Sequence, residues 1–409
     1  MSDTFDIRLT SLVYGGDALG RLPDGRAVFV PFALHGELVR ARSVEEKRGH
    51  LRAELVEVLE AAPCRVTPRC AHYTVCGGCN YQHLDYPAQL VAKTSILAEQ
   101  LRRLGGLTDV PIQPAVTSPQ PWNYRNHVQF HLTPEGQLGF QRAGSERVVP
   151  IRECHLPELE INQVWPQIEL GPLPGVERLS LRLGSDGEQL LVLESSDPQP
   201  LEFSVEELPV SAVHLGPGGG LVLAGSEHVQ MEVLGRPFQV SAASFFQVNT
   251  PQAAALVQHV LQLAGPAPLE TVLDVYCGVG LFSAFLAPLA RRLAGIELSP
   301  SAGEDFAVNL DEFEQVELYE AGAEAVLAAI DFHPDLILVD PPRAGLGHAV
   351  LDGLLAQHAP RLIYISCDPA TLARDARRLT AGGYRLAQIT PFDLFPQTYH
   401  IESVSLWQR

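Results

Sequence analysis

The chain has 409 residues, which is too long for one ordinary hydrophobic core and suggests two or three domains. Hydrophobic residues make up 46% of the chain and charged residues 19%. No run approaches the roughly 18 apolar residues of a membrane helix, and the first ten residues show no secretory signal. We therefore expect a cytoplasmic protein with no membrane partner. The net charge of −19 argues against nucleic acid as a partner. However, residues 1–154 carry 17 basic and 16 acidic side chains, whereas residues 155–409 carry 12 basic and 32 acidic ones. A polyanion would therefore be bound by the first part.

Residues 1–58 alternate apolar and polar side chains between glycine turns. Residues 5–9 and 27–30 are examples of this alternation, which predicts the short strands of a small all-β barrel. Small barrels with a basic face often bind RNA, but a solvated β surface would explain the same composition. Five basic residues lie in the second half of this segment: Arg40, Arg42, Lys47, Arg48 and Arg52.

Residues 62–235 form a second predicted domain, which begins with a cysteine-rich segment and continues as β-structure. Apolar and polar residues alternate over residues 127–132, and a β-hairpin is predicted over residues 177–194, with a Gly-Ser-Asp-Gly turn at 184–187. Residues 87–104 instead have the apolar spacing of a helix.

Residues 236–409 alternate strands with helices, which predicts a doubly wound α/β sheet with helices on both faces. Ligands of such sheets bind beyond the carboxyl ends of the strands, which is where the motifs of this region fall. Predicted helices include residues 252–263 and 371–379. The predicted strands are residues 271–276, 292–297, 316–319, 336–339, 362–365, 384–389 and 402–407.

The first of these strands ends in the motif DVYCGVG at residues 274–280, where Gly278 and Gly280 let the backbone turn sharply and approach a ligand. Ser283 stands where a dinucleotide-binding motif has its third glycine, so no pyrophosphate site is implied. Glu297 ends the next strand and could accept hydrogen bonds from two ribose hydroxyls; the alternative is a surface carboxylate at a strand end. A ligand with a ribose and no phosphate fits S-adenosylmethionine, with Asp274 as an anion near its positive charge.

The fifth strand ends in SCDP at residues 366–369, which makes Cys367 a candidate nucleophile. A methyltransferase needs such a thiol when its target is carbon 5 of uracil, which is a poor nucleophile. A thiolate that adds to carbon 6 activates carbon 5 for methylation. A base must then remove the proton from carbon 5. Glu402, at the start of the last strand, is the candidate base, and Asp340 could hold the uracil edge or orient the thiol. The thiol should therefore have a pKa below the free value of about 8.5. The alternative is that Cys367 is a buried structural residue, as we expect for Cys277.

Over essentially the whole chain, the sequence resembles the RNA uracil-C5 (5-methyluridine) methyltransferases. The motifs that carry the resemblance are DVYCGVG, SCDPAT at residues 366–371, DPPR at 340–343, HIE at 400–402 and SFFQVN at 244–249. The resemblance implies a class I S-adenosylmethionine-dependent methyltransferase domain with a Rossmann-like sheet at 236–409. It also implies an OB-like TRAM barrel that binds RNA at 1–58 and a central iron–sulfur and RNA-binding domain at 62–235, with residues 80–115 packing on the catalytic domain.

The same resemblance assigns roles to individual residues. Cys367 is implied as the nucleophile and Glu402 as the base, while Phe245 would stack on the target base after it leaves the RNA stack. Cofactor contacts are implied for Gln247, Tyr276, Glu297 and Asp340, in addition to Asp274, Gly278 and Gly280 of the glycine turn.

A tight group of cysteines at 70, 76 and 79 predicts a metal site, with Cys154 as the fourth ligand. Four thiolates suit zinc or an iron–sulfur cluster, and Cys64 stands outside the pattern. The spacing slightly favours zinc, whereas the glycine pair at 77–78, which exposes backbone N–H groups to the sulfurs, favours a cluster. The resemblance implies that Cys70, Cys76, Cys79 and Cys154 hold a [4Fe–4S] cluster with a structural role.

We expect the substrate to be RNA and not DNA, and the protein to be a monomer. The TRAM barrel and the cysteines together resemble bacterial enzymes that methylate 23S rRNA, which makes rRNA the leading substrate. A tRNA T-loop uridine is the alternative. A non-catalytic RNA-binding protein would not need Cys367 and Glu402, and an amino-group methyltransferase would not need the thiol.

Overall fold

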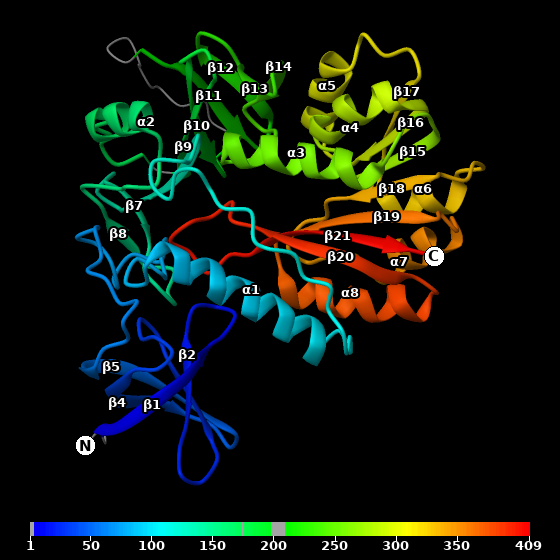
Figure 1. Cartoon of the computed structure of the whole chain (residues 1–409). Coiled ribbons are helices and arrows are strands. Elements are labelled where there is room, and N and C mark those ends of the chain that lie inside the picture. The colour runs from blue at the N-terminus through cyan, green and yellow to red at the C-terminus, as the bar shows by residue number, and fades with distance from the viewer. Residues whose placement is uncertain (1–3, 174, 198–208) are drawn as a thin grey trace.

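The computed structural model describes residues 4–173, 175–197 and 209–409, so the first three residues of the expected barrel and parts of the expected central domain lie outside the described residues. Three β-structures follow one another along the chain: a closed barrel, a seven-stranded sheet and a second seven-stranded sheet. Figure 1 shows the barrel at the N-terminal end of the molecule and the last sheet, with the C-terminus, at the other end.

The N-terminal barrel has five strands in the order β1-β2-β3-β5-β4, which confirms the all-β barrel predicted for this segment. Only β3 and β5 pair in parallel; the other neighbouring strands of the barrel are antiparallel. Side chains of alternate residues, such as Ile7 and Leu9, point inward and form a separate small core. The strands are β1 (Thr4–Leu12), β2 (Ala18–Arg21), β3 (Ala27–Val30), β4 (Leu38–Glu46) and β5 (His50–Glu60).

The central sheet has the strand order β12-β11-β10-β9-β6-β7-β8 and contains the predicted hairpin as β9 and β10. A short helix, α2 (Leu159–Val164), and the 3-10 turn η1 (Trp165–Gln167) cover it, with Trp165 packed on Phe130. The strands are β6 (His127–Leu132), β7 (Leu138–Gln141), β8 (Val148–Pro150), β9 (Val176–Leu183), β10 (Gln189–Ser195), β11 (Ser211–Gly216) and β12 (Gly219–Ala224).

A hairpin of β13 (His228–Val233) and β14 (Arg236–Ser241) connects the central sheet to the C-terminal one. The expected division between residues 235 and 236 falls in the turn of this hairpin, whose two strands stay paired. Its side chains belong to the core of the C-terminal sheet, where Phe238 is fully buried.

The C-terminal sheet has the strand order β17-β16-β15-β18-β19-β21-β20. Its first five strands are parallel, as in a doubly wound fold, whereas β21 lies antiparallel between β19 and β20. The strands are β15 (Leu269–Val275), β16 (Ala290–Glu297), β17 (Val316–Glu320), β18 (Leu336–Val339), β19 (Arg361–Ser366), β20 (Arg385–Phe392) and β21 (Glu402–Gln408). The helical segments are α3 (Thr250–Ala264), α4 (Leu281–Leu286), η2 (Ala287–Leu289), α5 (Pro300–Asn309), α6 (Ala323–Ala329), α7 (His348–Ala356) and α8 (Pro369–Ala381).

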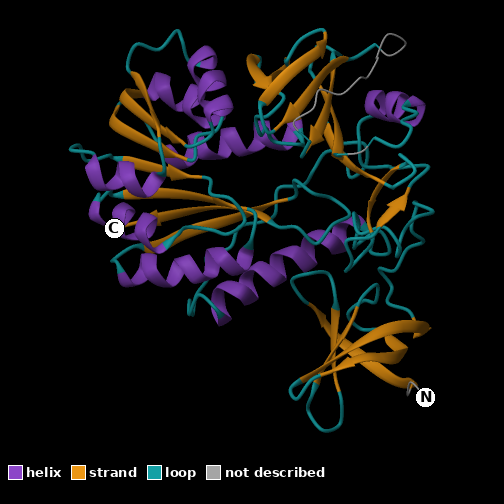
Figure 2. Cartoon of the chain, turned by 180° about the vertical axis from the view of Figure 1, so that it is seen from behind, coloured by secondary structure: helices purple, strands orange, loops and turns teal. Residues whose placement is uncertain are grey.

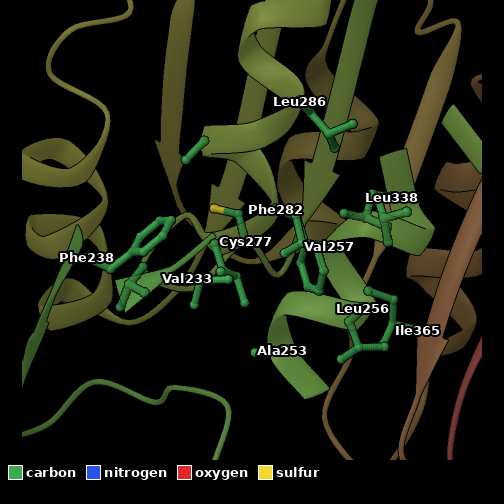
Figure 3. Close-up of a cluster of buried hydrophobic side chains, with 14 of the residues drawn as sticks. Val233, Phe238, Ala253, Leu256, Val257, Cys277, Phe282, Leu286, Leu338 and Ile365 are labelled. Carbon is green, nitrogen blue, oxygen red and sulfur yellow. The ribbon is translucent and has the colours of Figure 1, made fainter. Parts of the chain in front are cut away.

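Helices cover both faces of this sheet, as Figure 2 shows from behind. Alternate residues of β18 serve two cores: Leu336 and Leu338 belong to the core with α3, α4 and α5, and Ile337 and Val339 to the core with α6, α7 and α8. Figure 3 shows part of the first core, which also contains Cys277, buried as expected. Strands buried on both faces explain the continuous apolar runs of the sequence.

Helix α1 (Tyr86–Arg103) packs on this sheet although it precedes the central sheet in the sequence. Asp85 caps its N-terminus by accepting a hydrogen bond from the N–H of Ala88 at 2.8 Å. Its apolar face, including Ile96 and Leu97, lies in the same core as α8. Figure 1 shows α1 alongside α8.

Among the helices of the described residues, we find none that combines the length and the apolar character needed to cross a membrane.

Candidate active site

The turn after β15 lies at the carboxyl edge of the C-terminal sheet and has three residues with positive φ: Tyr276 (66°), Gly278 (55°) and Gly280 (89°). A Cβ on Gly280 would come within 2.3 Å of Leu310 Cδ1, so this glycine is required by packing. A Cβ on Gly278 would meet no atom within 4 Å. Gly278 therefore presents its backbone to open space, which suits close approach of a ligand.

Glu297 ends β16 and lies against this turn, at the edge where the sequence predicts it. Its Oε2 accepts a hydrogen bond from the N–H of Gly278 at 2.9 Å. Its Oε1 accepts from the N–H groups of Leu298 at 2.8 Å and Ser299 at 2.7 Å. A carboxylate has about four lone-pair positions, so these three bonds fix the side chain and leave capacity for another donor.

Two further carboxyl groups are buried beside the turn. Asp274 is fully buried, its Oδ2 accepts a hydrogen bond from Ser283 at 2.6 Å, and its Oδ1 has no partner in the described residues. Burial raises the pKa of Asp274 to about 7. Burial and the nearby Asp274 raise the pKa of Asp340, just after β18, also to about 7. Gln247 is the polar neighbour of Asp340, with Nε2 3.5 Å from Oδ2.

These observations test whether the edge fits S-adenosylmethionine. Burial disfavours the carboxylate forms of Asp274 and Asp340, and a nearby cation would stabilise them. With the unpartnered oxygen of Asp274 and the open glycine, this edge suits a ligand that brings positive charge. The expected cofactor residues Gln247, Asp274, Tyr276, Gly278, Glu297 and Asp340 all lie along this edge or contact a residue that does. The residues present therefore fit the sulfonium and amino groups of this cofactor.

Cys367 and Glu402 meet at the same edge because β21 runs antiparallel to β19. Ser366 pairs with Ser403. Because the strands are antiparallel, Cys367, which follows Ser366, lies next to Glu402, which precedes Ser403. Glu402 is only 4% exposed. Burial and the nearby Asp340 raise its pKa well above the ordinary value.

The thiol of Cys367 is half-buried. The prediction that its pKa lies below the free value is wrong for this structure. Burial, then Glu402 and Asp340, raise the pKa of Cys367 to about 12. The expectation came from the need for a thiolate; the sequence did not show that two carboxyl groups surround the sulfur. Arg343 is the neighbouring cation and acts in the opposite direction.

Arg343 and His400 are two site residues that sequence reasoning missed. Arg343 Nη2 lies 3.3 Å from Nε2 of His400. Burial and Arg343 lower the pKa of His400 to about 3, so the ring is neutral and its Nε2 can accept from Arg343. Both residues stood inside quoted motifs, DPPR and HIE, which was the only signal of their importance.

The four predicted ligand cysteines line one cavity of about 470 Å³: Cys70, Cys76, Cys79 and Cys154. Backbone N–H groups approach two of the sulfurs: His72 N–H lies 3.4 Å from Cys70 Sγ, and Gly78 N–H lies 3.4 Å from Cys76 Sγ. In the described ranges, however, no three Cys, His, Asp or Glu side chains gather closely enough to hold a metal ion. The thiols therefore converge on one space without forming a compact single-ion site.

The same cavity reaches the candidate active site, because Phe245 and Arg343 also line it. Phe245 is 68% exposed, unlike its neighbour Phe246, which is buried. An exposed aromatic ring at the rim of a cavity is available for stacking. Cys64 lies away from this cavity, in a groove between the barrel and α1.

Comparison with known proteins identifies relatives over the full length. The pattern of the family described as tRNA (uracil-5-)-methyltransferase matches residues 226–409, and that of the TRAM domain matches residues 3–56. An uncharacterized RNA methyltransferase of Aquifex aeolicus is 36% identical, over 98% of this chain and 97% of that protein. Another, from Thermosynechococcus vestitus, is 34% identical, over 98% and 97%.

A solved structure is similar over the same length. The Pyrococcus abyssi tRNA (uracil-54, C5)-methyltransferase, in complex with S-adenosyl-L-homocysteine, has a TM-score of 0.73 and 25% sequence identity to this chain. The match covers 98% of this chain and 100% of that chain.

Proposed function

Because this chain belongs to the RNA methyltransferases of the tRNA (uracil-5-)-methyltransferase family, we propose that it transfers a methyl group from S-adenosylmethionine to carbon 5 of a uridine in RNA. The product complex of the Pyrococcus abyssi relative and the acidic cofactor edge support this methyl donor. The observation that carries the proposed chemistry is that the pairing of Ser366 with Ser403 brings Cys367 and Glu402 close together at one strand edge.

In the proposed mechanism, Cys367 provides the nucleophile. Its thiolate forms a bond to carbon 6 of the uracil, and the electron pair of the 5,6 double bond moves into an enolate. Carbon 5 then takes the methyl group that bound S-adenosylmethionine would supply, and the sulfur–methyl bond breaks to leave S-adenosylhomocysteine. Carbon 5 then carries both the methyl group and its original hydrogen, so the reaction cannot end without a base.

Glu402 is proposed as that base. Its carboxylate removes the proton from carbon 5, the double bond forms again, and the thiolate of Cys367 leaves carbon 6. The raised pKa of Glu402 suits this task, because an ionised carboxyl group with a high pKa is a stronger base than an ordinary one. Arg343 favours the anionic forms of both groups.

Trapping on RNA that contains 5-fluorouridine tests this chemistry. Fluorine replaces the hydrogen that the base must remove, so elimination stops and a covalent protein–RNA adduct should accumulate. Cys367→Ala should form none, whereas Cys277→Ala, which changes a buried core thiol, should still form it if the variant folds. A wild-type protein that methylates RNA but leaves no adduct would contradict the covalent mechanism.

We also propose that Cys70, Cys76, Cys79 and Cys154 hold a [4Fe–4S] cluster with a structural role. Four free thiols around one cavity, with backbone N–H groups directed at two sulfurs, support a group larger than a single ion. Protein purified without oxygen should be brown and contain about four irons. Cys79→Ser should lose the colour, whereas Cys64→Ser should keep it. A colourless protein with one zinc would contradict the proposal.

A 23S rRNA uridine is the first candidate substrate, supported by the resemblance of the TRAM and cysteine layout to bacterial rRNA enzymes. A tRNA T-loop uridine is the second, favoured by the full-length similarity to the Pyrococcus abyssi tRNA (uracil-54, C5)-methyltransferase. Because that similarity extends over 98% of this chain, the layout alone does not separate the two substrates. Mapping 5-methyluridine in both RNAs from a strain without the gene would identify the lost site.

A further inference from the structure

Tyr14, in the loop between β1 and β2, extends from the barrel to the loop that carries Cys367. Its hydroxyl donates a hydrogen bond to Oδ2 of Asp368 at 2.8 Å, across 354 residues of sequence. Its ring meets that of Tyr399 edge-on, with centroids 5.5 Å apart and an angle of 86° between the planes. Tyr14 therefore contacts both the residue after the nucleophile and the segment that leads into Glu402.

The loop around Tyr14 is shaped for this contact. It is closed by two backbone hydrogen bonds, from Val13 N–H to Asp17 O at 2.9 Å and from Gly16 N–H to Val13 O at 3.2 Å. Gly16 has φ of 95°, and a Cβ there would lie 3.6 Å from that of Tyr399. The side chain of Tyr14 packs against the core that α1 and α8 share. The barrel is thus docked on the C-terminal domain through a tight turn.

Asp368 connects this contact to the nucleophile. Its Oδ1 accepts hydrogen bonds from the N–H groups of Ala370 and Thr371, both at 2.9 Å, and so caps α8. Its Oδ2 accepts from Tyr14. One carboxylate oxygen is fixed by its own helix and the other by the barrel. The backbone of Cys367 is held between this residue and Ser366, whose hydroxyl donates to the carbonyl of Asp368 at 3.0 Å.

We propose that Tyr14 is a positioning residue of the methyltransferase site, whose hydroxyl fixes Asp368 and thereby the orientation of the Cys367 thiol. This inference rests on the proposed function. Attack on carbon 6 needs the sulfur in a narrow range of positions, and a displacement of about 1 Å can lower a rate roughly 100-fold. The barrel then contributes to the chemical step in addition to binding RNA.

Tyr14→Phe tests this role, because it keeps the ring on Tyr399 and removes only the hydroxyl. With saturating 5-fluorouridine RNA and S-adenosylmethionine, the rate of adduct formation should fall about tenfold, as expected for loss of a charge-assisted hydrogen bond. The dissociation constants for RNA and S-adenosylhomocysteine should change by less than about twofold, because the hydroxyl is bonded to Asp368 and a positioning role affects the chemical step.

Tyr384→Phe is the matched control. It also removes one tyrosine hydroxyl, here a buried one that donates to the carbonyl of Ala359 at 2.7 Å within the C-terminal domain, away from Cys367. It should keep the wild-type rate of adduct formation. Asp368→Asn retains an oxygen for the helix cap, and adding Tyr14→Phe to it should cause no further decrease if Tyr14 acts through Asp368.

Each other outcome contradicts the role of Tyr14. A wild-type rate in Tyr14→Phe would remove it, and a loss confined to the RNA dissociation constant would make the hydroxyl an RNA contact. Independent decreases that multiply in the double variant would show that Tyr14 does not act through Asp368. A wild-type protein that forms no adduct would instead contradict the proposed function itself.

Discussion

Ser366 of β19 lies opposite Ser403 of β21, and this antiparallel pairing makes Cys367 and Glu402 neighbours at the carboxyl edge of an otherwise parallel group of strands. In a wholly parallel sheet the first residue of a strand lies at the opposite edge from the cofactor. The reversed direction of β21 therefore brings a residue at the start of a strand to the site.

Glu402→Gln should separate methyl transfer from product release. The thiolate can still attack and carbon 5 can still take the methyl group, but no carboxylate removes the proton. Turnover should fall by at least about 100-fold. Methylated RNA should stay attached to the protein, which gel analysis with a labelled methyl donor would detect. The double variant with Cys367→Ala should attach none, and a Glu402→Gln enzyme with normal turnover would exclude this residue as the base.

Arg343→Gln should lower the reactivity of Cys367 at neutral pH. Arg343 lowers the pKa of the thiol, so its removal raises that pKa further and decreases the thiolate fraction. Below the pKa of the thiol, its rate of alkylation rises about tenfold per pH unit. Raising the pKa by one unit shifts the whole curve of rate against pH to higher pH by one unit. The profile of the variant should therefore lie at higher pH than that of the wild type.

Alkylation of Cys367, followed by mass spectrometry as a function of pH, measures this effect without RNA. Arg343→Lys keeps a positive charge and should lie closer to the wild type. Identical profiles for Arg343→Gln and the wild type would show that the guanidinium does not affect the thiol.

Two glycines of the cofactor turn should respond differently to alanine. Gly278→Ala places its Cβ in open space, so the protein should fold, at a cost of about 1–2 kcal/mol for the left-handed backbone, but bind S-adenosylhomocysteine at least tenfold more weakly. Gly280→Ala directs its Cβ at Leu310 and should lower the melting temperature much more. Calorimetric titration and thermal unfolding measure both. Normal cofactor affinity in Gly278→Ala would place the ligand elsewhere.

The buried ion pair between Lys93 of α1 and Asp393 should contribute to stability and to the position of the segment before Glu402. Lys93 Nζ lies 2.6 Å from Asp393 Oδ1 and 3.0 Å from the carbonyl of Phe395, and both charged side chains are almost fully buried. Lys93→Met leaves the carboxylate buried without its cation, which costs about 3–5 kcal/mol.

Urea unfolding should show this loss as a lower midpoint. The double variant Lys93→Met with Asp393→Leu should recover part of it, because both charges are then gone. Lys47→Met, which removes an exposed cation of the barrel, should change the midpoint little. Equal midpoints for Lys93→Met and Lys47→Met would contradict a structural role for the pair.

Much of the fold could be predicted from local patterns. The strand predicted at 336–339 coincides with β18, and the helix predicted at 252–263 lies within α3, which Asn249 caps. Hydrophobic periodicity and turn residues are local properties, so they reveal elements and the strand ends where ligands bind. They also drew attention to Cys367 and Glu402 as candidates.

The sequence by itself determined the three-part order of the elements, the glycine turn and the chemical identity of the candidate nucleophile and base. Only the tertiary structure decided that β21 inserts between β19 and β20, that Tyr14 reaches Asp368, and that Lys93 pairs with Asp393. It also decided that burial, together with two nearby carboxyl groups, raises the pKa of Cys367. Strand order, long-range contacts and desolvation depend on which distant segments meet, and no local pattern of residues carries that information.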